Sequence, residues 1–327
     1  VNLQVKETFL KRSKIISSMR EFLTKEGFIE VETPILQSIY GGTNARPFKS
    51  FLNNLKMDVY MRISNELYLK RLIVGGYEKI FEFSSDFRNE GIDATHNPEF
   101  LQMETMWAYA NYEDNIKFVE KMLKYIVKKV FNKNKITYDK TTIDFGKPFV
   151  KLSMFNALKK YANINAEKLD VSELKNLLSK HHIEHENNIP WGNAVALLFE
   201  ELVEDKLIQP TILYDYPKET SPLAKIKASD SRFVERFELY INGWEIANSY
   251  SELNDPEILR KNWEEQEKRA KKGDEEAQRM DQDFLRALEI GLPPTSGLGI
   301  GIDRLVMILT DSQSIKDVIF FPFMKPG

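Results

Sequence analysis

Apolar and polar residues alternate along this chain with two different periods. The 3.6-residue period of amphipathic helices occurs at residues 7–28, 64–75, about 112–131 and, in large part, 255–291. The two-residue period of strands occurs at residues 28–36, 58–63, 79–87, 100–107 and on both sides of an Asn242-Gly243 hairpin turn. Long runs of strand without regular helical interleaving predict an α+β fold, with an antiparallel sheet flanked by helices and not a doubly wound sheet.

Turn and capping residues predict where these elements begin and end. The first helix is expected to stop at Gly27, and the strand after it is broken at Pro34. Asp255 is expected to be the N-cap of a later helix. Residues from about 151 to 235 mix amphipathic helices with polar loops, so we expect a peripheral, mostly helical region within a single domain spanning 1–327.

Two of the expected strands each have a charged face. In FEFSSDFRNE, alternation places the charged side chains of Glu82, Asp86, Arg88 and Glu90 on one face of the strand. In FLQMETMW, alternation places Phe100, Gln102, Glu104 and Met106 on one face, which mixes a charge with an aromatic ring. A solvated face is one interpretation. The other is a site for a polar ligand with a flat ring, because Arg88 offers a planar donor fork to phosphate or carboxylate and Phe100 could stack on a base.

The hairpin at Asn242-Gly243 brings two carboxylates together. Regular pairing on both sides of the turn sets Glu238 opposite Ala247 and makes Glu238 a diagonal neighbour of Glu245. Carboxylates that close repel each other unless a cation lies between them, and oxygen ligands alone favour Mg²⁺ or Mn²⁺ shared with phosphate. Alternatively, both acids are exposed to water or paired with lysines.

The segment GLGIGIDR is expected to form a strand with one face free of side chains. One face carries only glycine, at Gly297, Gly299 and Gly301, which leaves Leu298, Ile300 and Ile302 for the core. The segment matches neither the P-loop nor the Rossmann fingerprint, so we interpret it as a flat groove for a planar ring, with tight packing as the alternative. Asp303 is expected to cap the following helix, with Arg304 in its first turn, where an anion is favoured.

Composition limits the possible classes of protein. The 327 residues are 42% hydrophobic and 29% charged, which is ordinary for a globular protein, and the formal net charge of −3 gives no sign of a polybasic binder of nucleic acid or membranes. The absence of cysteine excludes disulfides and thiolate metal sites.

The features of the expected strands are best explained together. Two arginines, a carboxylate pair and a ring-sized groove on one sheet indicate an ATP site with a bent triphosphate.

The same segments resemble the three motifs of class II aminoacyl-tRNA synthetases. GFIEVETPIL is similar to motif 1, FRNEG with HNPEF and the following Glu104 to motif 2, and GLGIGIDR to motif 3. GGTNARPF, YMRISNELYLKRLIVGG, HNPEF, EIANSYSELNDP and GLPPTSGLGIGIDRLVM resemble the lysyl-tRNA synthetases in order and spacing, over essentially the whole chain.

This resemblance implies the class II catalytic domain, with an antiparallel sheet of six to seven strands and a homodimer formed through motif 1. It implies ATP-dependent activation of L-lysine with Mg²⁺, transfer to the acceptor end of tRNA(Lys), a cytoplasmic location and no membrane. The N-terminal OB-fold that reads the anticodon in full-length enzymes is expected to be missing from this chain.

The resemblance also implies a role for individual residues. The catalytic residues would be Arg88 and Arg304. ATP would be bound by Arg88, Glu90, His96, Asn97, Phe100, Glu238 and Arg304. The lysine would be bound by Gly42, Glu66, Arg88, Glu104, Asn248, Tyr250 and Glu252. Mg²⁺ would be bound by Glu238 and Glu245. Simple alternation separates Glu245 from the face of Asn248, Tyr250 and Glu252, so we expect a bulge or bend near Ala247.

The chain departs from the family pattern at a few positions. Met106 and Trp107 stand where Tyr-Met is usual, Tyr250 stands where many relatives have Phe, and Thr95 stands where many have Arg. A stand-alone paralogue that lysylates a protein such as an elongation factor is an alternative, but such paralogues tend to have alanine at the position of Gly299 and lack the ARPF segment. A non-catalytic module is a further alternative, although the motif 2 and motif 3 arginines are both present. Specificity for aspartate or asparagine is disfavoured by the acidic residues of the expected pocket.

Overall fold

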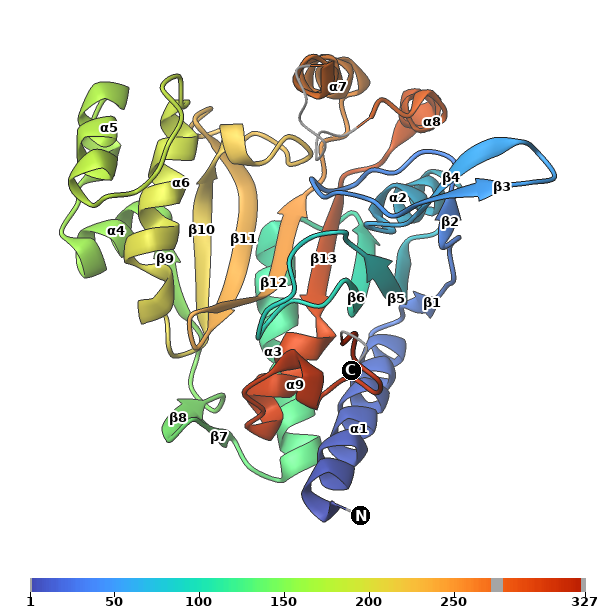
Figure 1. Cartoon of the computed structure of the whole chain (residues 1–327), viewed down its shortest axis with the longest axis vertical. Coiled ribbons are helices and arrows are strands. Elements are labelled where there is room, and N and C mark those ends of the chain that lie inside the picture. The colour runs from blue at the N-terminus through green and yellow to red at the C-terminus, as the bar shows by residue number, and fades with distance from the viewer. Residues whose placement is uncertain (1, 272–278, 325–327) are drawn as a thin grey trace.

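The structure, a computed structural model, describes residues 2–271 and 279–324 (Figure 1). Its α-helices are α1 (Leu3–Lys25), α2 (Glu66–Val74), α3 (Tyr112–Phe131), α4 (Met154–Ala162), α5 (Val171–Lys180), α6 (Trp191–Leu202), α7 (Pro256–Lys271), α8 (Gln282–Gly291) and α9 (Ile302–Thr310). Its strands are β1 (Ile29–Glu30), β2 (Leu36–Gln37), β3 (Lys49–Leu52), β4 (Met57–Met61), β5 (Lys79–Phe87), β6 (Glu99–Ala108), β7 (Lys135–Tyr138), β8 (Thr141–Asp144), β9 (Val150–Ser153), β10 (Thr211–Pro217), β11 (Phe233–Ile241), β12 (Trp244–Ser251) and β13 (Thr295–Gly301). Within the described residues, no helix combines the length and the apolar character needed to cross a bilayer.

The expected sheet is present, but it is larger and less uniform than the sequence indicates. Eight strands pair in the order β1-β5-β6-β13-β12-β11-β10-β9. The strands from β5 to β10 run antiparallel, whereas β1 pairs with β5 and β9 pairs with β10 in parallel. The prediction of a purely antiparallel sheet of six to seven strands is therefore corrected to a mixed sheet of eight. The two parallel strands are only 2 and 4 residues long, too short for an alternation pattern to reveal their partners.

One face of the sheet is covered by α3, which crosses behind the strands in Figure 1. This helix begins at a capping box, in which the Asn111 side chain accepts hydrogen bonds from the backbone of Glu113 and Asp114 while Asp114 accepts one from the backbone of Asn111. Its apolar stripe, including Val119 and Met122, joins the same core cluster as side chains of β5, β6, β11 and β13 and the inner faces of α1 and α9. The charged faces of β5 and β6 are consequently turned toward the other side of the sheet.

Most of the expected element limits are confirmed. The first helix ends at Lys25, and Gly27 follows with a φ of 86°, a conformation that glycine adopts without strain. The segment around Pro34 is divided between β1 and β2, which belong to different sheets. Asp255 caps α7 by accepting hydrogen bonds from the backbone of two residues of its first turn. The helical segment expected at 255–291 occurs as α7 and α8, and residues 272–278 lie outside the described residues.

The segment from 151 to 235 packs α4, α5 and α6 against β10 and β11 through a core cluster of its own. These helices lie at the edge of the molecule beyond β9 and β10 (Figure 1). Strand β10 of this segment is nevertheless part of the central sheet, between β9 and β11.

A bulge interrupts the β11–β12 hairpin and changes its register. The turn itself is as predicted, with φ angles of 56° at Asn242 and 73° at Gly243. Tyr240 pairs with Glu245 but Leu239 pairs with Ala247, so Ile246 is an extra residue on β12. The bend expected near Ala247 is thus confirmed. The pairing of Glu238 with Ala247 is wrong, because the bulge sets Glu238 opposite Asn248.

Candidate active site

A cavity of about 470 Å³ lies over the exposed face of strands β6, β12 and β13. Its polar lining follows from the register of the sheet, in which Glu104 of β6, Gly299 of β13 and Asn248 of β12 are direct neighbours. The next row joins Met106, Gly297 and Tyr250 in the same way. The alternating faces recognised in three separate segments of the sequence therefore form one continuous surface.

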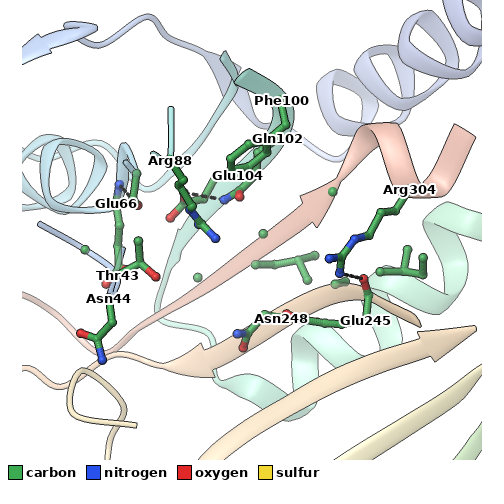
Figure 2. A pocket seen from close by; sticks show the side chains of 18 of the residues that line it. Thr43, Asn44, Glu66, Arg88, Phe100, Gln102, Glu104, Glu245, Asn248 and Arg304 are labelled. Carbon is green, nitrogen blue, oxygen red and sulfur yellow. Dashed lines mark hydrogen bonds between the residues drawn. The ribbon is translucent and has the colours of Figure 1, made fainter. Parts of the chain in front are cut away.

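The cavity gathers nearly all of the residues expected in the site. Those that line it are Gly42, Glu66, Arg88, Glu90, His96, Asn97, Phe100, Glu104, Glu245, Asn248, Tyr250, Glu252 and Arg304. The expected residue outside its lining is Glu238. Figure 2 shows Glu66 and Glu104 toward one end, with Arg88 beside Glu104, and Arg304 and Glu245 toward the other.

The floor of the cavity is the glycine face of β13. Leu298, Ile300 and Ile302 are buried on the other face, as expected. A Cβ atom on Gly297 would lie 2.5 Å from Oε1 of Glu252, and one on Gly299 would lie 3.0 Å from Nε2 of Gln102. The bare backbone thus gives side chains of neighbouring strands the room to extend across the sheet.

Arg88 and Phe100 form a cation–aromatic pair at one side of the cavity. The Arg88 guanidinium carbon lies 5.0 Å from the centroid of the Phe100 ring. Nε of Arg88 is buried and makes no hydrogen bond to the described residues. Glu90 lies beyond the end of β5 and is exposed at the cavity rim. A planar donor group and an aromatic ring are therefore available side by side to an anionic ligand with a flat ring.

Arg304 links strand β12 to the loop between β5 and β6 at the other end of the cavity. Its Nη1 donates to the backbone oxygen of Glu245 at 3.2 Å, as drawn in Figure 2, and its Nη2 donates to Nε2 of His96. Asp303, by contrast, does not cap α9, because Gly301 occupies the N-cap position. The buried Asp303 carboxylate instead accepts from the backbone of Leu101 at 2.7 Å and pairs with Arg12 of α1 at 2.6 Å. It fastens α9, and with it Arg304, to β6 and α1.

The opposite end of the cavity is acidic. Glu66, Glu104 and Glu252 are 5%, 6% and 1% exposed. Burial, reinforced by Glu66, raises the pKa of the Glu104 carboxyl well above its usual range. Burial also raises the pKa of Glu252 to about 8, although Lys70 opposes this shift. A bound cation would stabilise such a group of buried carboxyl groups in its ionised form.

The carboxylate pair of the hairpin is stabilised by an arginine that the sequence analysis did not single out. Arg236 forms an ion pair with Oε1 of Glu238, while the hydroxyls of Tyr216 and Tyr240 each donate to Oε2 at 2.6 Å. Glu245 keeps its side chain in the cavity, and burial together with Glu238 raises its pKa to about 7. Arg236 thus occupies the position next to Glu238 where a cation was expected between β11 and β12. Of the two carboxylates, Glu245 is the one that lines the cavity and can reach a ligand.

Two functional candidates besides Arg236 were missed by the sequence analysis. Gln102 lies on the same face of β6 as Glu104, as the alternation predicts, and its side-chain amide donates a hydrogen bond to the Glu104 carboxylate at 3.2 Å. Lys70 lies four residues after Glu66 on α2 and pairs with it at 2.5 Å. The i,i+4 spacing of Glu66 and Lys70 was the available signal for that ion pair.

Comparison with known proteins identifies the class to which this fold and site belong. Residues 1–325 match the family of class II tRNA synthetases for D, K and N, and the chain belongs to this family. It is 52% identical over 326 residues to lysine--tRNA ligase 2 of Methanosarcina acetivorans, covering 99% of this chain and 64% of that protein. It is 49% identical over 334 residues to lysine--tRNA ligase of Clostridium perfringens and 50% identical over 331 residues to that of Clostridium botulinum, covering 66% of each. The chain thus spans about two thirds of the length of these relatives.

Proposed function

We propose that this chain activates L-lysine with ATP and transfers the lysyl group to the 3′ end of tRNA(Lys). The observation that carries the proposal is one cavity with a glycine floor that has buried carboxyl groups at one end, Arg304 at the other, and Arg88 with the Phe100 ring beside Glu104. The acidic end suits the ammonium group of a long cationic side chain. The other end suits a nucleoside triphosphate.

The ATP would lie with its adenine ring over the glycine face, stacked on Phe100. Glu90 would accept a hydrogen bond from the adenine amino group, and Arg88 would bind the α-phosphate. Arg304 would cover the other face of the ring and reach the γ-phosphate. His96 and Asn97, which lie in the same loop beside Arg304, would contact the phosphates and the base.

The lysine would occupy the acidic end, with Glu66, Glu104 and Glu252 around its ammonium groups and Arg88 on its carboxylate. Asn248 and Tyr250 would line the same pocket from β12. Gly42 would lie near the α-amino group. Its φ of 93°, and a separation of 2.9 Å between a Cβ placed there and Oγ of Ser64, explain why this position carries glycine.

Mg²⁺ suits the oxygen donors of β11 and β12. Glu245, whose carboxylate is in the cavity, would be its first ligand, and Glu238 would be the second if Arg236 yields its oxygen. The ion would offset negative charge on the phosphate oxygens.

The reaction needs no nucleophile from the protein. An oxygen of the lysine carboxylate would attack the α-phosphorus in line and form a mixed anhydride, while the bond to the β-phosphate oxygen breaks and pyrophosphate leaves. The 3′-terminal ribose hydroxyl of tRNA would then attack the lysyl carbonyl, lose its proton and expel AMP. Arg88 and Arg304 would lower the barrier by aligning the reactants and by offsetting charge on the pentavalent phosphate.

The assembly and location follow the family. We infer one catalytic domain over residues 1–327, a homodimer formed through the motif 1 region and a cytoplasmic location. Exposed apolar side chains of this region, with Ile29 at 55%, Ile35 at 43% and Leu36 at 57%, support a partner surface there. The alternative, a paralogue that lysylates a protein, is not favoured by the tRNA ligase names of relatives at about 50% identity.

The direct test is ATP–pyrophosphate exchange with Mg²⁺, screened over the twenty standard amino acids and β-lysine. We expect exchange with lysine alone, followed by charging of tRNA(Lys) with the same chain. Exchange with β-lysine in place of lysine would point to a pocket changed at Met106 and Trp107. Absence of exchange with every amino acid would contradict the proposal, and exchange with transfer to a protein but not to tRNA would support the paralogue.

A further inference from the structure

Lys70 is a buried cation directly behind the acidic end of the cavity. It lies on α2, is 2% exposed and is not among the residues that line the cavity. Its Nζ lies 2.5 Å from Oε1 of Glu66 and 2.5 Å from Oε2 of Glu252. One ammonium group thus joins α2 to the end of β12, through two carboxylates that face the cavity.

The second oxygen of each carboxylate is left for the cavity side. Oε2 of Glu66 accepts a hydrogen bond from the Tyr250 hydroxyl at 2.7 Å. Oε1 of Glu252 has no hydrogen bond of normal geometry within the described residues, and it points to the bare backbone of Gly297. The contact with Lys70 therefore orients both carboxylates without filling the space in front of them.

The charges at this end nearly balance those of a lysine molecule. Glu66, Glu104 and Glu252 carry three negative charges when ionised, and Lys70 offsets one of them. The remaining two match the two ammonium groups of free lysine. Arg88 also lines the cavity, and it is the group that would face the carboxylate of the bound lysine.

We propose that Lys70 is a positioning residue that makes the pocket selective for a cationic side chain, by fixing the orientation of the Glu66 and Glu252 carboxyl groups. This inference rests on the proposed activation of lysine and deepens it. Without Lys70, the Glu66 and Glu252 carboxyl groups would remain buried beside Glu104 but would lose the ammonium group that joins them. Carboxyl groups that are no longer held in place would discriminate less against an uncharged side chain of the same shape.

The direction of the carboxyl pKa values agrees with this role. Burial raises the pKa of Glu252, and Lys70 is the largest influence that lowers it. Burial acts to lower the pKa of Lys70, but Glu252 and Glu66 outweigh it and raise that pKa. Lys70 thus remains charged throughout the range in which Glu252 titrates.

The test compares lysine with 2-aminoheptanoic acid, in which a methyl group replaces the side-chain ammonium. ATP–pyrophosphate exchange is measured for both in the unchanged chain, in Lys70→Met and in Lys70→Gln. We expect the lysine KM to rise at least tenfold in both variants and the preference for lysine over its neutral analogue to fall at least tenfold. The KM for ATP should stay within about threefold, since Lys70 contacts Glu66, Glu252 and Tyr250 and does not line the cavity.

Arg71→Met is the matched control on the same helix. Arg71 also forms an ion pair, with Asp281 at 2.5 Å, but it does not line the cavity or touch its carboxylates. Its loss should lower the melting temperature without changing the preference for lysine. A purely structural role of Lys70 would give the same result for Lys70→Met as for Arg71→Met.

The outcomes separate this inference from the proposed function. No lysine-dependent exchange in the unchanged chain would refute both. Normal exchange in the unchanged chain with an unchanged preference in folded Lys70→Met or Lys70→Gln would refute only the role of Lys70. If neither neutral variant folds, Lys70→Arg decides: a kept preference supports the inference, and a lost preference, or failure of all three variants to fold, overturns it.

Discussion

Arg304 and His96 are joined by a hydrogen bond of 2.7 Å between Nη2 and Nε2. Because a guanidinium only donates, Nε2 of His96 is the acceptor and the ring proton resides on Nδ1, which lies 2.8 Å from Oδ2 of Asp93. The order Asp93–His96–Arg304 therefore holds the arginine from motif 3 against the loop of motif 2, on the side where we expect the triphosphate.

His96→Ala should raise the KM for ATP about three- to tenfold, which corresponds to the loss of one exposed, charge-assisted hydrogen bond. Arg304→Ala should lower exchange far more, by roughly 10²–10³-fold, because it would remove the cation that we propose for the γ-phosphate. If His96 acts only by orienting Arg304, the double variant His96→Ala/Arg304→Ala should equal Arg304→Ala. Additive effects in this cycle would mean that His96 binds ATP independently.

Arg88→Ala should lower lysine-dependent exchange by about 10²–10³-fold or more, because the guanidinium would offset charge on both the α-phosphate and the attacking carboxylate. Arg20→Ala is the matched control, since Arg20 stacks on Phe83 at 4.7 Å as Arg88 does on Phe100 but lies on α1. Rates of exchange and melting temperatures of both variants give the comparison. A reduction of less than tenfold in Arg88→Ala would remove this residue from the catalytic role.

Gly297→Ala should weaken lysine binding, because the added Cβ would lie 2.5 Å from Oε1 of Glu252 and 3.0 Å from the terminal methyl of Met106. Displacing that carboxylate should raise the lysine KM at least tenfold and change the KM for ATP much less. Gly301→Ala provides the comparison on the same strand, since its nearest contact would be the backbone oxygen of Ile246 at 4.0 Å. Equal lysine KM values for the two variants would contradict the steric argument.

Lysine binding should strengthen as the pH rises from 6 to 8.5. The ammonium group needs ionised carboxylates, and burial raises the pKa of Glu252 to about 8 and that of Glu104 well above its usual range. Around these groups, Glu66, Asp86, Lys70 and Tyr250 are ionisable neighbours, and Lys70 holds Glu252 below the pKa that burial alone would give. The lysine KM should therefore fall by up to about tenfold per pH unit, over the pH range in which a pocket carboxyl group must release its proton for lysine to bind.

The stability of the ligand-free chain should change in the opposite direction. A carboxyl whose pKa is raised by folding contributes stability that is present below its unfolded pKa and is lost as the pH rises through the folded value. Melting temperatures should thus decrease between pH 6 and 8.5, and added lysine should restore more stability at the upper end. Glu252→Gln is the control, because it should flatten the pH profiles of both the lysine KM and the melting temperature near pH 8. If both profiles stay unchanged in this variant, other groups are responsible for the titration.

Much of the site could be predicted from the sequence because its signals are local. A two-residue period shows which side chains of one strand share a face, as for Glu104 and Gln102 or for Gly297 and Gly299. The Asn242-Gly243 turn fixes a hairpin by its own backbone preference, and the ends of α3 follow from nearby capping side chains. These features depend on residues within one turn or one strand of each other.

The tertiary structure decided how such segments meet. The bulge at Ile246 sets Glu238 opposite Asn248 and turns Glu245 toward the face of Tyr250, a shift that an unbroken alternation conceals. Asp303 binds Leu101 and Arg12 and leaves the capping position to Gly301, because a carboxylate at the start of α9 meets β6 and α1 only in the folded chain.

The same reason explains the two cations that complete the site. Arg236 lies two residues from Glu238 and Lys70 lies four residues from Glu66, so each has one partner that spacing could suggest. The contact of Lys70 with Glu252 joins segments far apart along the chain. Burial makes that contact strong, because a charge removed from water must be matched by another charge, and burial is a property of the assembled fold.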